Sequence, residues 1–127
     1  MKKITLIALL LLLPLTLLGS SFKKDLSFKS FTVVLSSKKP LTTGSNKIDL
    51  AVYNHDKALS KAKITIKSFM PAMPGMPYME IKAPALETHS GHYSSEIYFS
   101  MSGTWQLHIF ITTAEGKKVR LKTSVNL

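Results

Sequence analysis

The amino-acid sequence predicts an all-β fold: an immunoglobulin-like antiparallel β-sandwich of about seven strands, preceded by an N-terminal signal peptide. Three observations support this fold class. After residue 21, apolar side chains alternate with polar ones at a period of two. Turn-forming residues separate the alternating segments, and no apolar pattern of helical period interrupts them.

The N-terminal segment has the order of a secretory signal peptide. A positively charged start is followed by an apolar run over residues 4–18 and by small residues up to Ser21. The run has about 15 residues, fewer than the roughly 20 that a membrane-spanning helix needs. We therefore expect removal of residues 1–21 by cleavage between Ser21 and Phe22. A single periplasmic domain over 22–127 would remain, with no stable membrane anchor.

The predicted strands are the segments in which every second side chain is apolar. Successive side chains of a strand point to opposite faces of the sheet, so this alternation indicates half-buried strands. In chain order the segments are 31–35, 47–53, 63–67, 79–85, 92–99, 105–112 and 119–126. Pro84 would confine the fourth segment to a sheet edge or a bulge, since proline has no N–H to donate. We expect Trp105 to fill the core between the sheets.

Turn residues lie between these segments. The clearest breaks are Asn54-His55-Asp56, Ser90-Gly91, Ser102-Gly103 and Glu115-Gly116-Lys117. The last of them predicts a tight hairpin between the final two strands.

The composition excludes several classes of function. There is no Cys, which removes disulfides, thiolate metal sites and Cys nucleophiles. The formal net charge is +10, and it falls to +8 without the two lysines of the signal peptide. Export and the scattered lysines indicate a solvated basic surface, and no nucleic-acid partner is expected. Neither a Ser-His-acid pattern nor a pair of carboxylates stands out, so we do not expect an enzyme.

One segment breaks the alternation. Residues 69–79 contain four methionines at strict three-residue spacing: Met70, Met73, Met76 and Met79. Three of them are followed by proline, which favours a polyproline II helix with three residues per turn and thus one shared face. Gly75 would let the loop bend and bring two or three thioethers together. Thioether sulfur is a soft ligand that suits Cu(I), so the segment predicts a copper site.

Further ligands are predicted from neighbouring loops. His92, with His89 beside it, and Met101 are second-line candidates if these loops meet the methionine loop at one end of the sandwich. The alternative is that the methionines fill the core or form a protein-contact surface. Met70 and Met79 extend from apolar runs, which favours packing for those two.

The motifs that carry a family resemblance appear in a fixed order. They are the Ala-x-Ile strand within residues 59–67, Met70-Pro71-Ala72-Met73, Gly91-His92-Tyr93, and Met101-Ser102-Gly103-Thr104-Trp105. Together they resemble the YtkA-like/FixH-like exported domain family over residues 40–126. Within this group the chain is also similar to small secreted copper-resistance determinants of the CrdA type.

The resemblance implies an immunoglobulin-like sandwich outside the cytoplasm that is linked with copper handling or oxidase assembly. FixH-type members keep a membrane anchor, whereas this N-terminus has the pattern of a cleavable one. We therefore predict a periplasmic copper-binding or copper-resistance protein, with the copper ion and an envelope efflux or oxidase-assembly protein as partners. The alternative function is a non-metal envelope interaction module whose Met-Pro loop contacts a partner.

Overall fold

The computed structural model describes residues 22–127, which form nine strands and no helix. The predicted signal peptide, residues 1–21, lies outside the described residues. The strands are β1 (Phe22–Phe28), β2 (Phe31–Ser37), β3 (Gly44–Asn54), β4 (Lys57–Ala58), β5 (Lys63–Met70), β6 (Met79–His89), β7 (His92–Phe99), β8 (Thr104–Thr112) and β9 (Lys118–Asn126).

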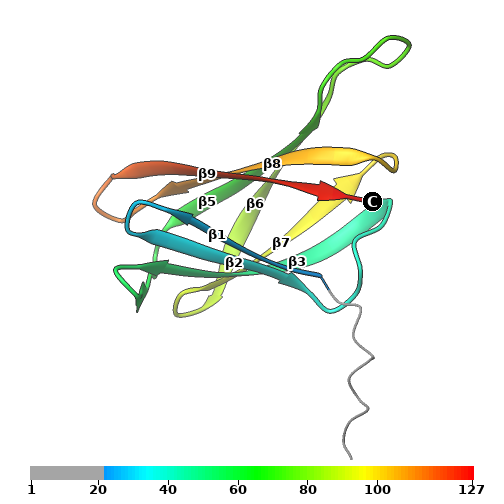
Figure 1. Ribbon diagram of the computed structural model, residues 1–127. Helices are drawn as coiled ribbons and strands as arrows, with labels where there is room; N and C mark the ends of the chain where they lie inside the picture. Colours follow the sequence, from blue (N-terminus) through cyan, green and yellow to red (C-terminus); the bar gives the residue numbers. More distant parts are fainter. Residues whose placement is uncertain (1–21) are drawn as a thin grey trace, which may run out of the picture.

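The strands form two layers joined by β6 (Figure 1). Strands β1, β2, β3 and β7 follow one another in the first layer, and β5, β8 and β9 in the second. The first part of β6 pairs with β5, and its last part pairs with β7. Every strand pair is antiparallel. The predicted all-β antiparallel sandwich is therefore confirmed, with nine strands in place of about seven.

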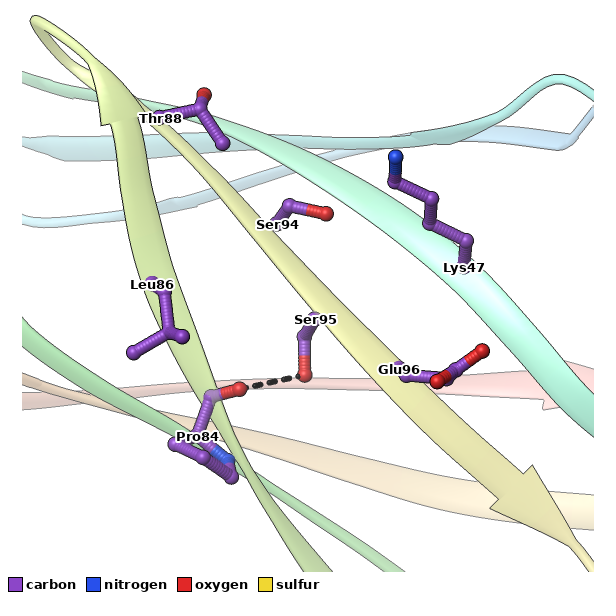
Figure 2. A pocket seen from close by; sticks show the side chains of 7 residues that line it. All are labelled: Lys47, Pro84, Leu86, Thr88, Ser94, Ser95 and Glu96. Carbon is purple, nitrogen blue, oxygen red and sulfur yellow. Dashed lines mark hydrogen bonds between the residues drawn. The ribbon is translucent and has the colours of Figure 1, made fainter.

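Pro84 marks the point where β6 changes its partner. It lies opposite Thr65 of β5, and from Leu86 onward the strand pairs with β7. The Ser95 hydroxyl of β7 donates a hydrogen bond of 2.9 Å to the Pro84 carbonyl oxygen (Figure 2). Proline has no N–H to donate to a ladder, and its carbonyl oxygen is satisfied here by a side chain of β7 where β6 changes partner.

The core lies between the layers and is built from the apolar members of the alternating segments. Trp105 is only 2% exposed, and its ring centroid lies 5.3 Å from that of Phe99. The prediction that Trp105 fills the core is confirmed. Buried Tyr93 holds the chain before β5, because its hydroxyl donates to the Leu59 carbonyl oxygen at 2.8 Å and accepts from the Ala62 N–H at 3.1 Å.

Two strands were not predicted. β1 has a single buried residue, Leu26, and its other side chains are exposed or half-buried, so the apolar alternation there is weak. β4 has two exposed residues that pair with the end of β3.

The predicted hairpin at Glu115-Gly116-Lys117 is confirmed: it joins β8 to β9, and Gly116 has φ +95°. Within the described residues, no helix has the length and apolarity needed to cross a membrane.

Candidate metal site

The methionine segment forms a hairpin arm that rises from the sandwich between β5 and β6 (Figure 1). Met70 and Met79 are the last pair of the β5–β6 ladder. Beyond them, Met73 and Met76 form an isolated bridge and exchange two backbone hydrogen bonds of 2.9 and 2.8 Å. The four methionines are thus two cross-strand pairs, one at the base of the arm and one near its tip.

The predicted polyproline II conformation is wrong. Pro74 and Gly75 form a two-residue turn between Met73 and Met76, and Gly75 has φ +82°. Proline followed by a glycine of positive φ suits a type II turn, and the turn returns the chain on itself. The three-residue spacing therefore places methionines opposite each other across a hairpin, not along one face of a rod.

At the base of the arm the methionines pack against the sandwich. Met70 is 3% exposed and belongs to the core, as the packing alternative predicts. Met79 and Met101 are half-buried against the core, and the Met79 sulfur accepts a hydrogen bond from the Ser100 hydroxyl at 3.4 Å. A Cβ at Gly103 would lie 3.0 Å from the Met70 methyl carbon. The base methionines and the loop between β7 and β8 thus meet at one end of the sandwich.

Near the tip the two methionines differ in exposure. Met73 is 50% exposed, whereas Met76 is half-buried and packs against the core cluster. Met101 at the base is held in place by Trp105, whose indole N–H donates to the Met101 carbonyl oxygen at 3.0 Å. The structure therefore groups the predicted methionines at one end of the molecule, and it leaves one of them open to solvent.

The predicted convergence of the histidines on this site is wrong. His89 and His92 flank the β6–β7 turn, whereas Met79 begins β6 at its other end. Met79 and His89 are the first and last residues of this strand, about 33 Å apart along it at about 3.3 Å per step, which is far beyond the reach of a shared ion. The sequence predicted a strand over residues 79–85 only, whereas β6 continues to His89 and separates the two loops by its whole length.

Aromatic and charged side chains flank the arm on the outer side of β5, β6 and β8. The Phe69 ring lies 6.0 Å from the Tyr78 ring and 4.9 Å from the His108 ring. The Tyr78 hydroxyl donates a 2.7 Å hydrogen bond to Glu80, which lowers the pKa of that carboxyl, with a further contribution from nearby Lys67. The same hydrogen bond raises the pKa of Tyr78.

Three open hollows of the described surface are lined by residues outside the methionine arm. The one drawn in Figure 2 lies over β6, β7 and β3 and is lined by Lys47, Pro84, Leu86, Thr88, Ser94, Ser95 and Glu96. Over residues 22–127, no three His, Asp or Glu side chains gather closely enough to hold a metal ion. A metal site at the arm would therefore depend on thioethers.

Comparison with known proteins matches this chain to a family and to a solved structure. A family model described as YtkA-like matches residues 26–110. No curated protein matches. Among solved structures, the crystal structure of the PmoD soluble domain from Methylocystis sp. (Rockwell) matches with a TM-score of 0.52 and 13% sequence identity, over 80% of this chain and 95% of that one. At this identity the likeness supports the fold alone.

Proposed function

The chain belongs to the YtkA-like family, and we propose that it is a periplasmic, non-enzymatic protein that binds Cu(I) through its methionine arm. The narrower likeness to copper-resistance determinants of the CrdA type stays a prediction.

The observation that carries the proposal is the pairing of Met73 with Met76 at the tip of the arm. Side chains directly opposite each other in an antiparallel pair have Cβ atoms about 5 Å apart. Each methionine adds three rotatable bonds, so both sulfurs can turn toward one ion. Two neutral, soft donors suit Cu(I) and are poor ligands for Mg²⁺ or Ca²⁺.

The other methionines differ in how readily their sulfurs could reach the ion. Met79 and Met101 are half-buried at the base and are candidates for further thioether ligands. Met70 is buried in the core, so its sulfur would need a rearrangement of the packing to reach an ion at the tip. His92 plays no part at this site, because it begins β7 beside the far end of β6.

A second function is favoured by the exposure of the arm. Met73 and Tyr78 are 50% and 49% exposed on a segment that projects from the sandwich. Exposed methionine and aromatic side chains are typical of adaptable contact surfaces. In this alternative the arm docks on an envelope efflux or oxidase-assembly protein without metal.

Competitive titration with Cu(I) separates the two functions. The test variant is Met73→Leu/Met76→Leu, which keeps the shape of the arm and removes two sulfurs. The matched control is Met70→Leu, which removes one sulfur from the core. We expect the affinity of the double variant to fall about tenfold or more, which corresponds to at least about 1.4 kcal/mol, and the control to bind as the parent does. Unchanged Cu(I) affinity in the double variant would contradict the thioether site.

If the arm is a contact surface, binding of an envelope partner should survive the leucine double variant, in contrast to Cu(I) binding. Leucine preserves the size and apolarity of methionine, so Met73→Leu/Met76→Leu would keep docking on an envelope partner. Met73→Ala/Tyr78→Ala would remove contact area and weaken it. Docking that survives the leucine variant but not the alanine variant, in a protein without Cu(I) affinity, would favour contact over metal binding.

A further inference from the structure

The tip of the β6–β7 hairpin holds two histidines in direct contact. His89 and His92 are register partners across the Ser90-Gly91 turn. Their rings stack with centroids 4.3 Å apart and planes inclined by 25°. Both side chains are exposed, and the hydroxyl of Thr88 lies 3.3 Å from Nδ1 of His89.

The two-residue turn pairs the two histidines, and a β-bulge fits the rest of β6 to this register. The register of β6 against β7 shifts between Glu87 and His89, so that Thr88 is left without a partner residue. In a regular strand His89 would face the side opposite to Thr88 and Leu86. The extra residue accommodates the pairing of His89 with His92, and re-aiming a side chain in this way is a known use of bulges.

The turn between the histidines is fixed by contacts that do not involve the imidazoles. The Gly91 carbonyl oxygen accepts from the Val52 N–H at 2.9 Å, and the Gly91 N–H donates to a Glu87 carboxylate oxygen at 3.3 Å. The Ser90 hydroxyl is 2.7 Å from the Ser60 hydroxyl. Because these three contacts already hold the turn, a metal ion that binds both rings would lose little free energy to ordering of the backbone.

We propose that His89 and His92 form a second metal site, which takes Cu(II) through one nitrogen of each imidazole after the stacked rings rotate about their side-chain bonds so that both nitrogens face one ion. Imidazole suits Cu(II), and Cu(II) is the strongest binder of the divalent first-row metals. A structural zinc site generally needs four protein ligands, and among the described residues no third His, Asp or Glu completes this cluster. Cu(II) in a tetragonal site accepts two imidazoles with water at the remaining positions.

Both acidic and basic side chains lie near His89. Asp49 and Glu96 line a surface hollow together with His89, and so do Lys38, Lys39 and Lys47. The Glu87 carboxylate accepts from the N–H groups of Gly91 and Lys61, so it positions the turn and is not free for the metal. Water or a small competing ligand would therefore complete the coordination.

This site is independent of the methionine arm. The two lie at opposite ends of β6, about 33 Å apart at about 3.3 Å per residue. Their ligand types also differ, since thioethers are soft donors and imidazoles are borderline. The failure of one proposal would leave the other standing.

Titration of the purified protein with copper(II) sulfate, with glycine as a competing ligand and electron paramagnetic resonance as the readout, tests the site. The parent should show a Cu(II) signal with nitrogen hyperfine structure. His89→Gln/His92→Gln should bind about tenfold or more weakly. His108→Gln, a half-buried histidine on β8, and Met73→Leu/Met76→Leu should bind Cu(II) as the parent does.

Two results would overturn the proposal. One is Cu(II) affinity in His89→Gln/His92→Gln equal to that of the parent, and the other is a parent that cannot compete with glycine for Cu(II). The single variants His89→Gln and His92→Gln, with urea unfolding midpoints measured for every protein, separate lost ligands from lost fold. Either single variant should already weaken binding, because a lone imidazole no longer chelates.

Discussion

The Ser95 hydroxyl donates to the Pro84 carbonyl oxygen at the place where β6 passes from one layer to the other. Ser95 is only 5% exposed, so Ser95→Ala would leave that carbonyl without its side-chain donor. We expect the free energy of unfolding to fall by about 1 to 2 kcal/mol, measured by urea denaturation. An unchanged midpoint would show that the junction is held without this bond.

Ser68 is a buried serine like Ser95, but the expected effect of its replacement by alanine has the opposite sign. It is fully buried on β5, and its hydroxyl finds no hydrogen-bond partner among the described residues. An unpaired buried hydroxyl is costly, so Ser68→Ala should raise the free energy of unfolding by up to about 1 kcal/mol. The same urea experiment checks it, and a loss comparable to that of Ser95→Ala would mean that the Ser68 hydroxyl has a partner in solution.

The turn at Gly91 should tolerate no side chain. Its φ is +76°, and an added Cβ would lie 2.6 Å from the Ala58 Cβ. Gly91→Ala should therefore cost about 2 kcal/mol or more in unfolding free energy, since strain and overlap act together. Gly116→Ala is the control, because φ is +95° there but no atom lies within 4 Å. It should cost about 1 kcal/mol, from strain alone. Equal losses would rule out the overlap at Ala58.

His108 should make stability depend on pH. Burial lowers the pKa of this histidine, and the nearby charges of Arg120, Lys122 and Lys67 lower it further. The unfolded chain then binds the proton more readily, so stability is full above about pH 6.5 and is lost as the pH falls toward the lower folded pKa. His108→Gln should reduce the drop in urea midpoint between about pH 7.5 and pH 5. A drop of unchanged size in the variant would assign it to other groups.

Alternation was enough to predict seven of the strands, because each presents one buried face to the core. Trp105 and the Gly116 hairpin followed from side-chain size and turn chemistry. Alternation does not reveal β1, since Leu26 is the one residue of this strand that is buried. The change of partner at Pro84 also has no local pattern, because it depends on contacts between strands distant in sequence.

The methionine arm shows that the predicted residues lie together but in another conformation than the one predicted. Three-residue spacing and the prolines favoured a polyproline helix, but the Pro74-Gly75 turn allows Met73 and Met76 to exchange two hydrogen bonds. His89 and His92 were missed as a pair of their own. The signal was present in the order His-Ser-Gly-His, which places two imidazoles opposite each other across a two-residue turn.

X-ray absorption at the copper edge of the Cu(I)-loaded protein tests the proposed arm site most directly, because it identifies the ligand atoms. We predict a shell of sulfur scatterers without nitrogen, which is lost in Met73→Leu/Met76→Leu and retained in His89→Gln/His92→Gln. A shell dominated by nitrogen, or a sulfur shell unchanged in the methionine variant, would contradict Cu(I) binding by the Met73–Met76 pair.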